Sequence, residues 1–462
     1  MHANIAPKDA VAIPIVALTT DGLEEALAQH NGDAALARNQ DFKAQPGRVL
    51  VVYGGDGQVV RAYLGLGTQA DPTLFGALAA KLPSGDYAVA GAMTPDEAQV
   101  ALTHFLLGAY VFDAYKKKPA RAARLVPPEG SDALAAGRIA DAVALGRDLV
   151  NQPPNHMGPD DLERAALTLA NAHGATIERI CGDDLLTQNY PLIHAVGRGS
   201  AQQPRLLILR LGRADAPKVA IVGKGVTFDT GGLNLKPGAG MALMKKDMGG
   251  AACALALLSS LAQARLDIAL SVYLPIVENS MDGQSFRPSD VITARNGLRV
   301  EIDNTDAEGR LILADAITRA SEDGNALILD LATLTGAARV ALGPELPPFF
   351  TDDEALAADL SHAAQHAQDP LWRLPLWRPY EDDLDSNIAD IKNSGGPFAG
   401  AINGALFISK FVKTTGNDPV WAHLDVYCWN PKEKPAHPMG GEVHAVRAID
   451  ALLRARFPAL PA

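Results

Sequence analysis

Val219-Ala-Ile-Val-Gly-Lys-Gly-Val-Thr-Phe-Asp-Thr-Gly-Gly232 joins an apolar run of four residues to a glycine-rich loop that holds one lysine and one aspartate. A run this short and this apolar is typical of a strand that is buried on both faces. Further strands of this kind are expected at 206–211, 270–274 and 327–331, and helices are expected from Gly249, Leu311, Gly400 and His444. The alternation predicts an α/β fold with a mixed, mostly parallel sheet flanked by helices.

The chain has 462 residues, which is too long for one ordinary core and indicates two domains. Residues 1–125 alternate short strand-like and helix-like segments, so they are expected to form a small α/β domain. Residues 126–159 contain Pro and Gly breakers on both sides of an Ala-rich amphipathic stretch, which predicts a linker with a helix. Residues 160–462 are expected to form the larger α/β domain.

Composition narrows the functional class. A net charge of -12 and a pI near 5.4 oppose binding to nucleic acid, which requires a basic surface. Three widely spaced cysteines exclude a disulfide framework and favour a reducing compartment. The first residues show no basic region followed by an apolar run, and the longest uncharged stretch, 248–264, is shorter than the ~20 residues that span a bilayer. A cytoplasmic protein without a membrane association is expected.

Charged residues cluster where the predicted strands end. Lys224 and Asp229 lie in the loop after the first strand, Asp247 precedes an uncharged helix, and Asp306 and Glu308 lie where a strand turns into a helix. Ligands of open α/β sheets bind beyond the carboxyl ends of the strands, so these side chains are expected to converge. Four carboxylates in one crevice would repel one another, and two bound divalent cations would relieve that repulsion.

Each of these motifs also has a purely structural interpretation. The loop around Lys224 resembles a phosphate-binding loop, but Lys218 stands where that motif needs Gly and Gly225 where it needs Ser or Thr. Asp229 alone is compatible with a turn, and Asp247 alone with a carboxylate at a helix N-terminus. Only their common position at strand ends favours a single site.

Several blocks of this sequence resemble the leucyl aminopeptidase (cytosol aminopeptidase) family. Asn304-Thr-Asp-Ala-Glu-Gly-Arg-Leu311 has the form of the family signature. Three further blocks, at 222–232, 245–251 and 331–337, follow the family pattern at the expected intervals. The likeness covers most of the chain beyond residue 140, whereas residues 1–125 match only as a small α/β domain with an expected role in assembly or substrate access.

The resemblance implies a metallo-aminopeptidase that releases N-terminal residues from short peptides. Lys224, Asp229, Asp247 and Glu308 would hold one metal ion, and Asp229, Asp306 and Glu308 the other. The family uses zinc, manganese, magnesium or cobalt. Lys236 would stabilise the tetrahedral intermediate, and Arg310, with backbone near Leu334, would hold a bicarbonate ion that acts as general base for a metal-bridging water.

The family's specificity pocket is expected here around Met244, Thr333 and Tyr427. The sequence departs from the family after Asp425, where Val426-Tyr-Cys-Trp-Asn430 replaces the usual small residues. The bulky Tyr427 and Trp429 are therefore expected to reshape the pocket, and a preference for leucine does not follow. Packing of these aromatic residues away from the site is the alternative.

Two other functions remain open at this stage. A two-metal phosphoesterase also uses clustered carboxylates, although the acidic charge and the lysine ligand disfavour it. A non-catalytic homologue would act as a binding protein, although every functional position of the signature blocks is filled. The resemblance further implies a homohexamer with short peptides as substrates.

Overall fold

The structure, a computed structural model, describes residues 2–412 and 418–460. The chain divides into two compact units, Met1–Ala144 with Asn430–Gly440 and Leu145–Trp429 with Gly441–Ala462. The division falls within helix α5 (Ala133–Asn151), inside the segment 126–159 that is expected to contain a linker helix. Segment 430–440 returns to the first unit, which sequence patterns cannot show because the contacts involved are distant in the chain.

The first unit is built on a five-stranded sheet in the order β2-β3-β1-β4-β5. Its strands are β1 (Ile13–Leu18), β2 (Val49–Tyr53), β3 (Val59–Gly65), β4 (Gly85–Val89) and β5 (Ala123–Leu125). All neighbouring strands are parallel except the β2–β3 pair. Its other helices are α1 (Leu23–Ala28), α2 (Asp33–Asn39), η1 (Pro72–Ala77), α3 (Leu78–Lys81) and α4 (Pro95–Gly108). This is the small α/β domain that the strand and helix pattern predicts.

The second unit contains a mixed nine-stranded sheet in the order β15-β14-β17-β13-β8-β10-β7-β6, with β9 pairing to β10. The strands are β6 (Thr176–Cys181), β7 (Arg205–Leu211), β8 (Lys218–Gly223), β9 (Gly225–Asp229), β10 (Ala269–Asn279), β13 (Leu327–Ala332), β14 (Pro348–Phe350), β15 (Trp372–Arg373) and β17 (Val420–Asp425). The central strands β17, β13, β8 and β10 are parallel, and β7 and β6 continue the sheet antiparallel. The fold is α/β, as predicted.

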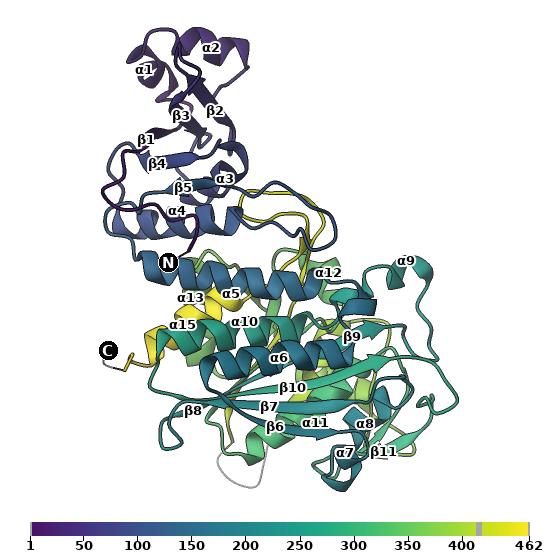
Figure 1. The fold of residues 1–462 in the computed structure, drawn as a ribbon. Coiled ribbons are helices and arrows are strands. Elements are labelled where there is room, and N and C mark those ends of the chain that lie inside the picture. Colours follow the sequence, from purple (N-terminus) through teal and green to yellow (C-terminus); the bar gives the residue numbers. More distant parts are fainter. Residues whose placement is uncertain (1, 413–417, 461–462) are drawn as a thin grey trace. The chain divides into compact units, whose positions relative to one another are not determined.

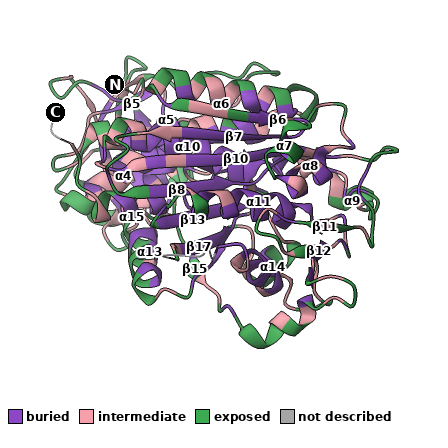
Figure 2. Cartoon of the chain, turned by 90° about the horizontal axis from the view of Figure 1, so that it is seen from below, coloured by how far each residue is buried: buried purple, intermediate pink, exposed green. Residues whose placement is uncertain are grey.

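Helices cover both faces of this sheet. Helices α10 (Gly249–Ala264) and α6 (Pro159–His173) lie on one side, and α11 (Glu308–Glu322) and α8 (Pro191–Gly197) lie on the other (Figure 1). The strands between them are therefore buried along most of their length (Figure 2), and Val219 to Val222 are 0% exposed. Burial on both faces explains why the strands are continuous apolar runs rather than alternating ones.

The other described elements include two small sheets and further helices. They are η2 (Pro154–His156), α7 (Asp184–Thr187), α9 (Gly238–Met241), η3 (Met244–Lys246), β11 (Val291–Thr293), β12 (Arg299–Glu301), α12 (Gly336–Leu342), α13 (Glu354–His366), η4 (Arg378–Leu384), β16 (Ile391–Lys392), α14 (Gly400–Ser409), β18 (Trp429–Asn430), β19 (Gly440–Gly441) and α15 (Val446–Arg456). Among the described residues, no helix combines the length and apolar character needed to cross a bilayer.

Helix α10 approaches the sheet closely because it begins with two glycines. A Cβ atom on Gly250 would lie 2.1 Å from the carbonyl oxygen of Leu331 and 2.8 Å from the backbone nitrogen of Lys224. Backbone atoms of two central strand ends cannot move apart cheaply in a packed core. The glycine therefore sets the distance between the helix and the residues that follow β8 and β13.

Replacing Gly250 with alanine is expected to lower the free energy of unfolding by about 1–3 kcal/mol, through overpacking. Denaturant unfolding followed by circular dichroism measures the change. Gly283→Ala is the matched control, because a Cβ there meets nothing within 4 Å. Equal stability of the two variants would contradict the close-packing argument.

Candidate active site

All eleven residues expected at the site line one cavity of about 560 Å³ within the second unit. They are Lys224, Asp229, Lys236, Met244, Asp247, Asp306, Glu308, Arg310, Thr333, Leu334 and Tyr427. Strands β8, β13 and β17 are parallel, so the loops that follow them open at the same edge of the sheet. Lys224, Thr333 and Tyr427 lie in these loops, and the cavity therefore occupies the usual ligand position of an open α/β sheet.

Lys224 is the buried centre of one half of the cluster. Its Nζ lies 2.8 Å from Asp247 Oδ2 and 2.9 Å from Glu308 Oε1, and it donates a hydrogen bond of 2.8 Å to the carbonyl oxygen of Thr333. Burial works to lower the pKa of Lys224, but the negative charges of Asp247 and Glu308 outweigh it and raise the pKa. In the absence of other cations, the ammonium group of Lys224 therefore offsets only part of the negative charge of these two carboxylates.

Lys236 has the same role in the other half of the cluster, where it pairs with Asp229 and Asp306. Its Nζ lies 2.8 Å from Asp229 Oδ2 and 2.5 Å from Asp306 Oδ1. The other oxygen of Asp229 accepts hydrogen bonds from the backbone N–H of Gly231, at 2.9 Å, and from Asn279 Nδ2, at 2.8 Å. Asp229 is thus held in place from the side opposite to Lys236.

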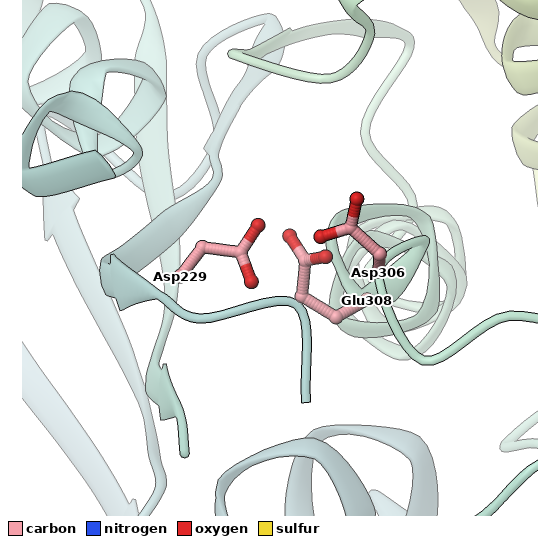
Figure 3. Close-up of side chains that lie close together, drawn as sticks. All are labelled: Asp229, Asp306 and Glu308. Atoms are coloured by element: carbon pink, nitrogen blue, oxygen red, sulfur yellow. The ribbon is translucent and has the colours of Figure 1, made fainter. Parts of the chain in front are cut away.

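Asp229, Asp306 and Glu308 point towards one another from the end of β9 and the start of α11 (Figure 3). Each offers a carboxylate oxygen, and these oxygens lie within 4.8 Å of one another. Burial, reinforced by the charge of Asp247, raises the pKa of Asp229 to about 6. Burial, reinforced by the charge of Asp229, raises the pKa of Glu308 to about 8. The cluster is therefore short of positive charge even with two lysines present.

The donor set fits divalent cations. Hard and borderline ions bind oxygen ligands, and three carboxylates at this spacing can be shared between two ions. Glu308 Oε2 is buried and has no hydrogen-bond partner among the described residues, although a buried carboxylate oxygen normally has one. Bound cations would supply that partner and would restore ionisation of Asp229 and Glu308 at neutral pH.

Removal of divalent cations should make stability fall with rising pH. The folded-state pKa of Glu308, about 8, lies above its ordinary value of 4.5, so the folded state binds more protons between these two values. Unfolding then releases protons, and the free energy of unfolding decreases as pH rises through this window. Thermal unfolding of chelator-treated protein between pH 5 and pH 9 should show a falling Tm, whereas Mn²⁺-loaded protein should not. An identical pH dependence of both forms would contradict the burial of an unneutralised Glu308.

Arg310 projects from the first turn of α11 and is 7% exposed. One terminal nitrogen donates to the carbonyl oxygen of Asn393 at 2.8 Å, whereas Nε is buried without a hydrogen-bond partner among the described residues. Burial lowers the pKa of Arg310 to about 10, so the side chain is still charged at neutral pH. A buried, incompletely paired guanidinium that lines the cavity is suited to bind a small anion.

Three supporting residues were not identified as functional from the sequence. Asn279 holds Asp229, the side chain of Asn393 accepts from the backbone N–H groups of Asp303 and Asn304, and Asp425 accepts from the backbone N–H of Leu334 at 3.0 Å. Each acts on a residue at least 50 positions away. The signal for Asn393 and Asp425 in the sequence is that both lie in the part beyond residue 140 that resembles the family, whereas Asn279 gave no signal of its own.

The cavity wall beside Tyr427 is cationic. Lys246 Nζ lies 4.7 Å from the centroid of the Tyr427 ring, and Arg339 Cζ lies 5.3 Å from it. Burial lowers the pKa of Lys246. Trp429, in contrast, is not among the residues that line the cavity, and its ring packs against Lys245. Of the two aromatic residues expected to reshape the pocket, only Tyr427 faces it.

Comparisons with known proteins identify the family of the chain. The model of the cytosol aminopeptidase family, catalytic domain, matches residues 144–449, and that of the M17 aminopeptidase N-terminal domain matches residues 13–128. The probable cytosol aminopeptidase of Bradyrhizobium sp. is 36% identical over 451 residues, which cover 91% of this chain and 89% of that protein. The probable cytosol aminopeptidase of Roseiflexus castenholzii is 40% identical over 380 residues, 78% of this chain and 77% of that protein.

Solved structures extend the likeness to the whole chain. The cytosol aminopeptidase of Coxiella burnetii is 38% identical, with a TM-score of 0.91 over 98% of this chain and 99% of that one. The bottromycin maturation enzyme BotP in complex with Mn is 33% identical, with a TM-score of 0.87 over 97% of this chain and 100% of that one. The chain belongs to the cytosol aminopeptidase family, and it is a metallo-aminopeptidase of the leucyl type.

Proposed function

We propose that this enzyme removes N-terminal residues from short peptides with two divalent cations held by the carboxylate cluster. Asp229, Asp247, Glu308 and Lys224 would hold one cation, with Lys224 as the neutral amine because an adjacent dication depresses its pKa. Asp229, Asp306 and Glu308 would hold the other. The observation that carries the proposal is the convergence of Asp229, Asp306 and Glu308, whose oxygens lie within 4.8 Å of one another. The solved relative BotP is described in complex with Mn, which supports Mn²⁺ as the first ion to test; Zn²⁺, Mg²⁺ and Co²⁺ are the others.

The cations, when bound, would supply Lewis acidity that activates water near neutral pH and stabilises developing negative charge. Lys236 is 15% exposed in its side chain and lines the cavity, so its ammonium group can donate to the carbonyl oxygen of the scissile bond. A donor at that position is worth most in the tetrahedral intermediate, when the oxygen carries a full charge. Asn279 and the backbone of Gly231 would keep Asp229 oriented throughout.

Arg310, near Leu334, would hold a bicarbonate ion that supplies a base next to the reacting water. The unpaired Nε and the buried position of the guanidinium support this assignment. Arg310 alone would not bind a phosphodiester substrate well, because one buried arginine does not form a row of basic residues along the phosphate groups. The cavity therefore gives no support to the two-metal phosphoesterase, and the family match does not favour a non-catalytic binding protein.

Metal analysis and paired assays test the proposal. Dialysed protein loaded with Mn²⁺ or Zn²⁺ should bind two ions per chain and should hydrolyse aminoacyl p-nitroanilides. It should not hydrolyse bis-p-nitrophenyl phosphate. Release of p-nitrophenol without release of p-nitroaniline would replace the peptidase by the phosphoesterase.

We further propose a cytoplasmic homohexamer in which the residues 1–125 limit access to short peptides. The relatives carry the name cytosol aminopeptidase, and their match extends to the N-terminal domain. Light scattering after gel filtration should give six times the 48.5 kDa of one chain. A monomer that retains full peptidase activity would refute this assembly.

A further inference from the structure

Lys246 and Arg339 form a pair of cations that the peptidase chemistry described above does not use. Lys246 is 5% exposed, and both residues line the cavity on the faces of the Tyr427 ring. In the part of the chain that the structure describes, no carboxylate lies within ion-pair distance of either side chain. The ring stabilises the positive charge but accepts few of the hydrogen bonds that an ammonium group can donate.

A nearly buried ammonium group without an anionic partner is costly. Buried lysines are normally paired, and the neighbouring carboxylate of Asp247 is already engaged by Lys224 at 2.8 Å. The anionic partner that Lys246 lacks among the described residues can therefore arrive with the substrate. An anionic group entering the cavity would exchange its hydration for a charge-assisted hydrogen bond.

The charge balance of the whole cavity favours the same conclusion. Five basic and five acidic side chains line the cavity. Four of the acidic side chains are those expected to bind the divalent cations, and the fifth is Asp425. Two divalent cations would leave the cavity with an excess of positive charge, even with Lys224 as a neutral ligand and a bicarbonate ion on Arg310. A cleft lined by an excess of one sign of charge attracts ligands of the opposite charge.

Lys246 and Arg339 lie beside the expected specificity pocket, and this position favours one kind of anionic ligand. Met244 lies two residues before Lys246, and Thr333 hydrogen-bonds to Asp247. The side chains of Lys246 and Arg339 both lie over the ring of Tyr427. We infer that Lys246 and Arg339 bind the side-chain carboxylate of an acidic N-terminal residue, so that the enzyme prefers peptides beginning with Glu or Asp. This inference rests on the proposed two-cation peptidase activity.

Isosteric substrates test the charge requirement. The Mn²⁺-loaded enzyme is assayed with glutamyl and glutaminyl p-nitroanilides, which differ in charge but hardly in size and contain no peptide C-terminus. The kcat/KM for the glutamyl substrate is expected to exceed that for the glutaminyl one by roughly 10- to 100-fold, the effect of a charge-assisted hydrogen bond. Calorimetric binding of free L-glutamate and L-glutamine should show a preference of the same sign.

Substitutions test whether Lys246 and Arg339 cause the preference for the glutamyl substrate. Lys246→Met is expected to bring the glutamyl-to-glutaminyl ratio close to one, and Arg339→Gln to reduce it several-fold. Lys246→Glu should shift the preference towards lysyl p-nitroanilide. Lys245→Met is the matched control: Lys245 does not line the cavity, and its Nζ donates to the carbonyl oxygen of Asn151 at 2.7 Å, so the ratio should stay at the wild-type value.

A glutamyl-to-glutaminyl ratio near one in the wild type, or a ratio that Lys246→Met leaves unchanged, overturns the inference. If the same protein still hydrolyses leucyl p-nitroanilide, the peptidase proposal stands. A charge preference that appears only with free dipeptides, and not with their C-terminal amides or with anilides, also overturns it, since the anion would then be the peptide C-terminus. Hydrolysis of no anilide at all refutes the peptidase proposal itself. If circular dichroism shows that Lys246→Met is misfolded, the exposed Arg339→Gln decides.

Discussion

Glu308→Gln is expected to reduce the turnover of aminoacyl p-nitroanilides by roughly 10³-fold or more and to remove most of the bound metal. The substitution preserves the size of the side chain but removes the charge that both proposed cations share. It also removes the negative charge from the side chain whose oxygen lies 2.9 Å from Lys224 Nζ. Turnover and the metal content of dialysed protein, measured by mass spectrometry, should fall together.

The matched control for this prediction lies on the same helix. Glu322 is at the far end of α11 and pairs with Arg295 at 2.7 Å. Glu322→Gln should leave both metal content and turnover within about twofold of the wild type, because an exposed ion pair contributes little to stability. Retention of two metal ions by Glu308→Gln would mean that the cations bind elsewhere.

Lys236→Met is expected to lower kcat by about 10²–10³-fold while the metal content stays at the wild-type value. The ammonium group is assigned to the oxyanion rather than to a cation, so its loss should affect the transition state more than substrate binding. Steady-state kinetics should therefore show a large change in kcat and a small change in KM.

Lys218→Met serves as the control for Lys236. Its Nζ donates to the backbone oxygen of Asp323 at 3.0 Å, away from the residues that line the cavity. Loss of metal from Lys236→Met would assign this lysine to cation binding, through Asp229 at 2.8 Å and Asp306 at 2.5 Å. Unchanged kcat would remove Lys236 from the mechanism.

The central strands could be predicted from the sequence because burial on both faces requires uninterrupted apolar residues. The run at 219–222 is strand β8, and that at 327–331 is β13. The run at 206–211 is strand β7, but its antiparallel pairing with β10 was not evident, because an apolar run has the same composition in either direction. Strand direction depends on the connections and on the partners available.

Helix boundaries were less accurate than helix positions. A helix was expected from Leu311, whereas α11 begins at Glu308, so that Glu308 and Arg310 lie in its first turn. A residue that binds a ligand from a helix end gives no apolar periodicity, and periodicity is what locates helices in a sequence. Glu308 and Arg310, the residues proposed to bind a cation and an anion, therefore fall outside the pattern that identifies their own helix.

The sequence by itself determined the α/β class, the strands that end in charged loops and the carboxylates and lysines of the site, because those features depend on local composition and on order along the chain. Only the tertiary structure decided which groups are paired. Among residues 2–412 and 418–460, it gave Lys224 and Lys236 separate carboxylate partners and left Glu308 Oε2 without a hydrogen bond. It also placed Lys246 and Arg339 beside one aromatic ring, with no carboxylate of these residues within ion-pair distance. The physical reason is that electrostatic pairing depends on distances of a few ångströms between residues far apart in the chain, and local sequence does not encode those distances.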